Sequence, residues 1–192
     1  MRASGNNSTP AAPYIIDANA GIGHVHLKVA DLQRALDFYS GVLGLEVMQR
    51  YGEGAVFLAA GGYHHHIALN TWESLGGSPA PAGTTGLYHT AIVYPTRAAL
   101  ATALRRVLAA KIPLQGAADH GVSESIYLND PDENGVELYC DKPKEKWPRG
   151  ADGNLEMYTR RLDLHALLSE APAGSELESG PQGSVGRTRL PL

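Results

Sequence analysis

The chain has 192 residues and a formal net charge of −4, and 43% of its residues are hydrophobic. This length suits one domain with a full core and a tail. The charge argues against a nucleic-acid partner, because such binding needs a basic surface. No apolar stretch is long enough to cross a membrane, so a membrane partner is not expected. The single cysteine, Cys140, excludes an intrachain disulfide and favours a cytoplasmic location.

The first half of the chain begins with an expected flexible arm over residues 1–20. GIGHVHLK then predicts a strand in which His24 and His26 share one face. Apolar residues recur at helical spacing between Asp31, a plausible N-cap, and Gly44, a plausible C-terminal signal. Three short strands separated by glycine turns are expected next, over residues 45–51, 55–61 and 64–70.

A segment rich in Gly, Pro and Ser over residues 72–85 predicts a linker, and the same order of elements then starts again. LYHTAIVYP predicts a strand, and TRAALATALRRVLAA predicts a helix. A loop of small residues is expected after this helix, followed by the strands SESIYLNDP and VELYCD. GHVHLKVADLQRAL aligns with YHTAIVYPTRAAL, so that His24 corresponds to His89.

This internal repeat predicts an α+β fold in which each half reads βαβββ. The two modules span residues 21–71 and 86–142, and together they form an expected domain over residues 21–142. Residues 143–192 predict a largely irregular C-terminal extension, with a short helix over 163–170.

Two histidines at equivalent positions and one acid indicate a metal site between the modules. His24 and His89 each stand early in the first strand of a module, while Glu137 lies between Val136 and Leu138 in an apolar strand. A buried carboxylate is costly unless it is paired or bound to metal. Two imidazoles and a carboxylate are the donor set of non-haem ferrous oxygenases. The alternative is that both histidines are hydrogen-bonded structural residues and that Glu137 pairs with a Lys or Arg.

The segments GIGHVHLKVADLQRALDFYSGVLGLEV and DPDENGVELY resemble the vicinal oxygen chelate superfamily over residues 21–142. This superfamily includes glyoxalase I, bleomycin and fosfomycin resistance proteins, and extradiol dioxygenases. The resemblance implies one eight-stranded, cup-like metal-binding domain with His24, His89 and Glu137 as the metal ligands. Fe(II) is the metal that it favours, and Mn(II) could replace it.

Within this superfamily the chain is most similar to type I extradiol (catechol 2,3-) dioxygenases. Glyoxalase I typically has a further Glu ligand on the last strand of its first module, and HHHIALN has no acid. The resemblance implies three catalytic residues: His65 as the acid–base group, Tyr127 ten residues before Glu137, and His120 in the loop DHGVSES. The implied reaction is ring cleavage of a small aromatic diol with dioxygen. A glyoxalase-like lyase or isomerase and a non-catalytic small-molecule-binding protein are the alternatives.

The histidine run in YHHHIALNTW predicts only one catalytic group. In a strand, His64 and His66 would face one side and His65 the other; a structural role for His65 is the alternative. His26 and Tyr139 are further candidates for lining the substrate site. We expect the eight strands to close around one metal within the chain, and the molecule to form a homodimer or higher homo-oligomer. The long linker also permits modules to pair between two chains.

Overall fold

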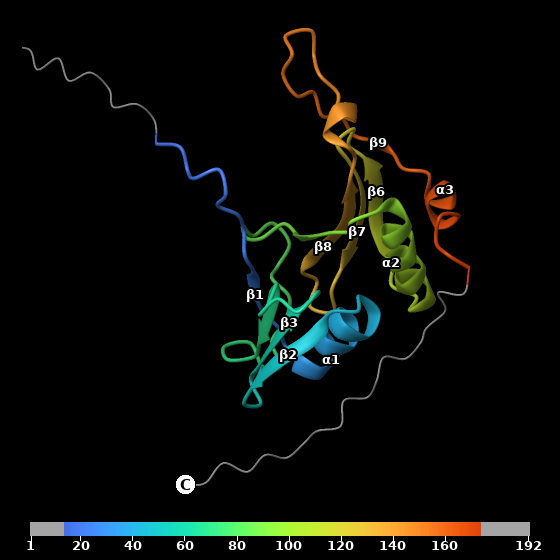
Figure 1. Cartoon of the computed structure of the whole chain (residues 1–192). Helices are drawn as coiled ribbons and strands as arrows, with labels where there is room; N and C mark the ends of the chain where they lie inside the picture. Colours follow the sequence, from blue (N-terminus) through green and yellow to red (C-terminus); the bar gives the residue numbers. More distant parts are fainter. Residues whose placement is uncertain (1–13, 174–192) are drawn as a thin grey trace, which may run out of the picture.

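The computed structural model describes residues 14–173, which form two β-sheets and the helices packed against them (Figure 1). The first module contains β1 (Val25–Lys28), α1 (Leu32–Leu36), the π-helix η1 (Asp37–Val42), β2 (Glu46–Tyr51), β3 (Ala55–Ala59) and β4 (Ile67–Asn70). The second contains β5 (Thr90–Val93), α2 (Arg97–Ala109), β6 (Leu114–Asp119), β7 (Ser123–Asn129) and β8 (Gly135–Asp141). The C-terminal extension adds the 3₁₀-helix η2 (Lys144–Lys146), β9 (Arg160–Arg161) and α3 (Leu164–Leu168).

The two modules have the same topology, which confirms the α+β class and the βαβββ repeat. Their sheets have the orders β1-β4-β3-β2 and β5-β8-β7-β6, and β9 extends the second sheet beyond β6. The first and last strands of each module run parallel, whereas the other neighbours are antiparallel. His24 directly precedes β1 and His89 directly precedes β5, so the two histidines occupy equivalent positions.

The helices begin where side chains cap them. The carboxylate of Asp31 accepts a hydrogen bond from the N–H of Arg34 at 2.9 Å, as the sequence predicts. The hydroxyl of Thr96 likewise accepts from the N–H of Ala99 at 3.1 Å at the start of α2. The first helix ends before Gly44, whose φ of +84° is a conformation that favours glycine.

One hydrophobic core joins the two modules, and it contains residues of α1, α2 and both sheets. Within this core the hydroxyl of Tyr39 donates a hydrogen bond to Asp130 at 2.9 Å. Burial, followed by the nearby carboxylate of Asp130, raises the pKa of Tyr39, so this hydroxyl keeps its proton. The guanidinium of Arg106 on α2 donates to the carbonyl oxygens of Gly41 and Val42, each at 2.7 Å. The packing of the two modules is therefore fixed by the shared core, by one buried hydrogen bond and by more exposed contacts of Arg106.

The structure corrects two predicted boundaries. The strand expected over residues 64–70 begins only at Ile67, so the alternation of His64, His65 and His66 along a strand does not apply. Those histidines follow a glycine turn; the chain bends at His64 and His66, and the ring of His64 contacts that of His65. The loop expected after α2 instead contains β6. Its glycine and alanines have low strand propensity, but β6 has β7 on one side and β9 on the other.

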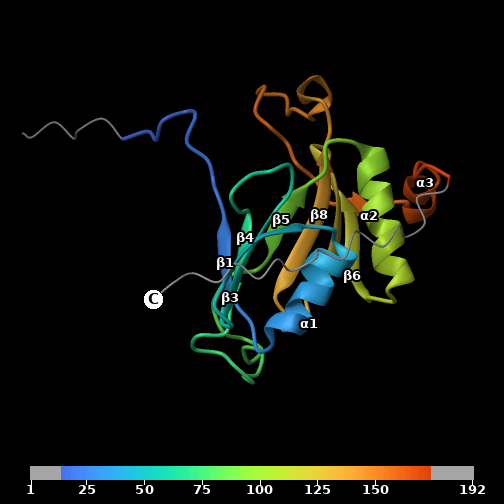
Figure 2. The same ribbon diagram turned by 60° about the horizontal axis from the view of Figure 1, so that its bottom comes forward.

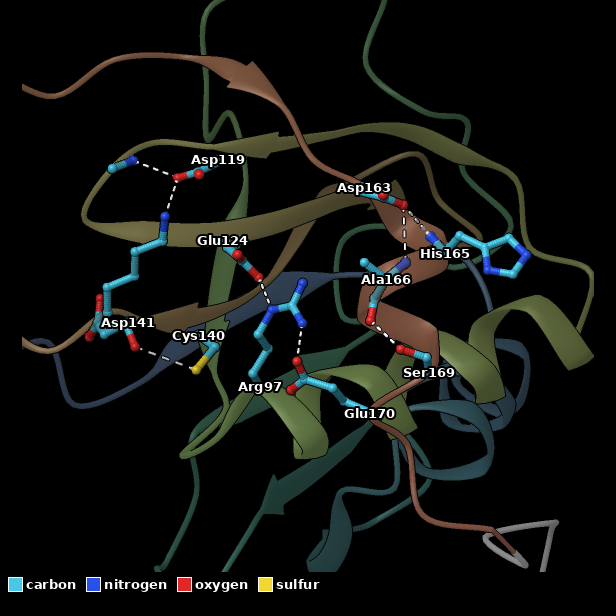
Figure 3. Close-up of polar contacts among 12 residues, drawn as sticks. Arg97, Asp119, Glu124, Cys140, Asp141, Asp163, His165, Ala166, Ser169 and Glu170 are labelled. Carbon is cyan, nitrogen blue, oxygen red and sulfur yellow. Dashed lines mark hydrogen bonds and ion pairs between the residues drawn. The ribbon is translucent and has the colours of Figure 1, made fainter. Parts of the chain in front are cut away.

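The extension is more ordered than predicted in its described part. Asp163 caps α3 by accepting from the N–H groups of His165 and Ala166 (Figure 3). Arg97 of α2 contacts both Glu124 of β7 and Glu170 after α3, which ties the extension to the second module (Figure 3). Residues 1–13 of the expected arm and 174–192 of the extension lie outside the described residues. Between residues 14 and 173, no helix has the length and apolar character needed to cross a membrane.

Replacing Tyr39 by Phe should lower the free energy of unfolding by about 1–3 kcal/mol, because the buried carboxylate of Asp130 loses a donor. Urea denaturation followed by circular dichroism measures this change. Tyr51→Phe is the matched control, because Tyr51 is 65% exposed; its effect should stay within about 0.5 kcal/mol. Equal stability of the Tyr39→Phe variant and the wild type would contradict the role given to this bond.

Replacing Gly135 by Ala should also destabilise the fold, because the segment that leads into β5 passes very close to this residue. An added Cβ would lie 2.1 Å from the carbonyl oxygen of Tyr88 and 3.1 Å from the Cβ of His89. We expect a loss of about 1–3 kcal/mol in urea denaturation. Gly116→Ala is the control, since its Cβ would meet only Tyr127 at 3.9 Å. A Gly135→Ala variant as stable as this control would show that β5 does not need the close approach.

Candidate functional site

The first group of candidate residues surrounds Glu137 on β8. Its neighbours Val136 and Leu138 are buried in the core, so the carboxylate lies on the opposite face of the strand. One carboxylate oxygen lies 2.9 Å from Nε2 of His89, which the parallel pairing of β5 with β8 brings alongside. The other accepts a hydrogen bond from the hydroxyl of Tyr127 at 3.0 Å, because Tyr127 and Glu137 are register partners on β7 and β8.

His120 extends this group into the C-terminal extension. Its Nε2 lies 2.8 Å from the hydroxyl oxygen of Tyr127. Its Nδ1 lies 3.1 Å from the carbonyl oxygen of Tyr158, and the carbonyl can only accept, so Nδ1 carries the hydrogen. The hydroxyl of Thr159 is 3.3 Å from the same nitrogen. The sequence reasoning missed Tyr158 and Thr159, since neither belongs to a motif and both are distant from His120 along the chain.

The hydroxyl of Tyr127 keeps its proton near neutral pH. Burial, followed by the negative charge of Glu137, raises the pKa of this phenol. Tyr139 shares the Glu137 face of β8 and is partly buried. Burial, then Asp141 and Glu137, raise the pKa of Tyr139 in the same direction.

The second group of candidate residues lies in the first module. The rings of His24 and His65 are 4.3 Å apart between centroids, and the ring of Phe57 lies 5.1 Å from that of His65. His64 contacts His65 with their Nδ1 atoms 2.7 Å apart, whereas His66 stacks on Tyr63. Partial burial, then the neighbouring imidazoles, lower the pKa of His65 and favour its neutral form.

His26 contacts two residues that are distant from it in the sequence, Asn70 and Trp72. Its Nε2 accepts a hydrogen bond from the amide of Asn70 at 2.9 Å, and Trp72 packs edge-on against its ring at 5.5 Å. Asn70 is buried at the end of β4. Asn70 is a polar residue at the end of an otherwise apolar strand, and this feature of the sequence could have identified it as a partner of a site residue.

The chemistry of the predicted ligands suits a metal ion, but their arrangement in one chain is incomplete. Two ligands at right angles on one ion, each about 2.1 Å from it, lie about 3 Å apart; the His89 and Glu137 atoms are 2.9 Å apart. His24 belongs instead to the other group. Throughout residues 14–173, no three His, Cys, Asp or Glu side chains are arranged to hold a metal ion. The metal and catalytic roles of these residues therefore stay predictions.

The candidate groups are separate from three cavities that the structure forms elsewhere. These cavities have volumes of about 720, 460 and 490 Å³, and none is lined by a predicted site residue. The largest lies between β6 and the segment that contains β9 and α3. The predicted site residues thus lie outside these three partly open cavities.

Comparison with known proteins finds relatives that are named as dioxygenases of catechol and of biphenyl-2,3-diol. Catechol-2,3-dioxygenase of Bacillus subtilis (strain 168) is 38% identical over 157 residues, which is 81% of this chain and 54% of the relative. Biphenyl-2,3-diol 1,2-dioxygenase 2 of Rhodococcus globerulus is 32% identical over 132 residues, which is 65% of this chain and 64% of the relative. The chain thus spans about half to two thirds of the length of these relatives.

Two solved structures have a similar fold. Lactoylglutathione lyase from Agrobacterium tumefaciens is 25% identical, with a TM-score of 0.50 over 65% of this chain and 96% of that one. A glyoxalase/dioxygenase from Nostoc punctiforme is 19% identical, with a TM-score of 0.56 over 69% of this chain and all of that one. At 19% identity, the similarity to the Nostoc punctiforme protein concerns the fold alone.

A family model matches residues 21–138, the region that contains both modules and the residues from His24 to Glu137. This match covers more than half of the chain and agrees with the repeated βαβββ topology. The chain belongs to the Glyoxalase/Bleomycin resistance protein/Dioxygenase superfamily.

Proposed function

We propose that the protein is a metal-dependent extradiol dioxygenase, an oxidoreductase that cleaves a catechol-like aromatic ring with dioxygen. The observation that carries this proposal is the continuous polar chain from His89 through Glu137 and Tyr127 to His120. It joins two predicted metal ligands to two predicted catalytic residues. The names of the relatives, catechol-2,3-dioxygenase and biphenyl-2,3-diol dioxygenases, support an aromatic diol as the substrate.

The metal that we propose is Fe(II), with Mn(II) as a substitute. Two imidazoles and a carboxylate are a donor set that leaves coordination positions open. The residues for it are His24, His89 and Glu137, although one chain brings only the last two into contact. We include in the proposal a cytoplasmic homo-oligomer that takes part in the breakdown of aromatic compounds.

The side chains beside the predicted ligands suit proton transfer. The single hydroxyl proton of Tyr127 is donated to Glu137 in this structure. If a metal engaged this carboxylate, the same proton could turn to an oxygen of the diol, with His120 beside the hydroxyl. His65 favours its neutral form, and a neutral imidazole can accept a proton from a diol hydroxyl and return it later. His26 and Tyr139 are the proposed substrate contacts.

A glyoxalase-like lyase is the second candidate, and its support is the fold shared with lactoylglutathione lyase. The strand register argues against it. His24 and His89 are equivalent, β1 pairs Val25 with Ile67, and β5 pairs Thr90 with Val136. Ala68 therefore occupies in the first module the position that Glu137 occupies in the second. The first module offers no carboxylate at the place where a fourth ligand would stand.

The proposed reaction can be tested with protein loaded anaerobically with Fe(II). Catechol and 2,3-dihydroxybiphenyl should each be offered, and oxygen uptake should accompany a yellow ring-cleaved product. The hemithioacetal of methylglyoxal and glutathione is the comparison substrate, and the protein should not convert it. Metal-loaded protein that consumes no oxygen with any diol would overturn the dioxygenase proposal, and turnover of the hemithioacetal would favour the lyase.

Replacing Tyr127 by Phe should lower kcat for the diol by about 10²–10⁴-fold, the usual contribution of an acid–base group. The bound metal should remain near the wild-type amount, because Tyr127 contacts the ligand Glu137 and is not itself a ligand. His165→Ala on the exposed surface of α3 is the control and should keep full activity. Unchanged kcat in the Tyr127→Phe variant would remove this residue from the mechanism.

A further inference from the structure

Two neighbouring histidines of the first module bring their ring nitrogens together. Nδ1 of His64 lies 2.7 Å from Nδ1 of His65, and the centroids of the two rings are 4.6 Å apart. One of these nitrogens must carry a hydrogen that the other accepts, because two bare lone pairs would repel each other at this distance. A metal ion can take the place of that hydrogen, since neutral imidazole is the commonest metal ligand among side chains.

The backbone of the loop between β3 and β4 produces this pair. The loop turns at Gly61 and Gly62, whose φ angles are +65° and +75°, and the chain bends at His64. Neighbouring side chains of a strand point to opposite faces, so two adjacent histidines can face each other only where the strand is interrupted. In Figure 2 the strands β3 and β4 lie together in the first sheet, well apart from α3. The pair therefore belongs to the first module alone.

Other rings hold both imidazoles in place. The ring of Tyr63 lies 4.1 Å from that of His64 between centroids. On the other side of the pair, the rings of His24 and Phe57 lie 4.3 Å and 5.1 Å from that of His65. Donors that are already held in position lose little side-chain freedom when they bind an ion. The two Nδ1 atoms are therefore preorganised for a shared ligand.

The third histidine of the run has a different role. Nδ1 of His66 accepts a hydrogen bond from the N–H of Ala60 at 3.3 Å, and its ring stacks on Tyr63 at 4.7 Å. His66 thus uses this nitrogen to fix the loop, whereas the pair before it does not contact the backbone through Nδ1. His64 is exposed and His65 is partly exposed, so an ion in solution can reach them.

The distance between the two nitrogens indicates which ions suit the pair. Two imidazole nitrogens at about 2.0 Å from one ion lie about 2.8 Å apart at a right angle and about 3.3 Å apart at the tetrahedral angle. The observed 2.7 Å is close to the right-angle value. Cu(II) and Ni(II) favour such square-planar or tetragonal arrangements of nitrogen ligands, and Cu(II) binds more tightly than Ni(II) or Zn(II). Since no third His, Cys, Asp or Glu of residues 14–173 joins the pair, water would fill the other positions.

We propose that His64 and His65 form a second metal site, for Cu(II) or Ni(II), which is separate from the proposed iron site. An ion on His65 would occupy the ring that the proposed mechanism uses to accept and return a proton. The expected consequence, which rests on the proposed function, is that these ions inhibit the diol reaction. The binding of the ion does not depend on that function.

The binding is tested by titrating the metal-free full-length protein with Cu(II), followed by calorimetry and electron paramagnetic resonance. Loss of the outer-shell partner of a ligand usually costs about 10–100-fold in metal affinity, and loss of a direct ligand should cost at least as much. His64→Ala should therefore weaken the tightest copper site at least about tenfold and remove one nitrogen from the copper spectrum. His66→Ala is the matched control and should keep the wild-type affinity. Equal affinity of the His64→Ala variant and the wild type would overturn the site.

The inhibition is tested with Ni(II) on Fe(II)-loaded protein, because Ni(II) does not take an electron from Fe(II). Each protein is compared with its own rate without nickel. Half-inhibition of the wild type should need at least about tenfold less Ni(II) than half-inhibition of the His64→Ala variant. Equal sensitivity of the two proteins would overturn the inhibition. Absence of diol-dependent oxygen uptake in every protein would overturn the proposed function, and the copper titration would still decide the second site. If His64→Ala fails to fold, His64→Gln takes its place.

Discussion

The carboxylate of Glu137 needs polar partners because it stands in a strand whose neighbours, Val136 and Leu138, are buried in the core. Its two oxygens meet His89 on one side and Tyr127 on the other. Tyr127 in turn contacts His120, whose ring is held by the carbonyl of Tyr158. The polar contacts that begin at the carboxylate of Glu137 thus connect β8 with the start of β5, with β7 and with the C-terminal extension.

A second constraint is the burial of one face of each sheet. The helices α1 and α2 share a core that covers one side of both sheets, and Tyr39 and Asp130 form a buried hydrogen bond inside it. A sheet whose strand pairs are mostly antiparallel, as in both modules, can leave its other face toward water. The residues with the chemistry of a metal site lie on those other faces. The same packing that stabilises the chain therefore separates His24 from Glu137.

Much of the fold could be predicted from local patterns. The cap Asp31 and the apolar spacing in both segments predict the two helical regions, and the structure confirms both. The histidine run was wrongly predicted as strand because three identical polar residues have no apolar–polar contrast from which a boundary can be placed. The strand β6 was missed because Gly116 and its alanine neighbours do not favour a strand; the pairing with β7 and β9 decides its conformation.

The sequence by itself determined the repeat, its βαβββ order of elements along the chain and the residue types available to a metal, because periodicity, turn residues and an acid in an apolar strand are local features. The resemblance to extradiol dioxygenases implied that Tyr127 would accompany Glu137, and β-strand register places them together. Only the tertiary structure decided that His89 meets Glu137 in the described chain while His24 lies with His65. The reason is that the placement of one module against the other depends on contacts between distant residues, such as Tyr39 and Asp130, and the local pattern of neither residue specifies its partner.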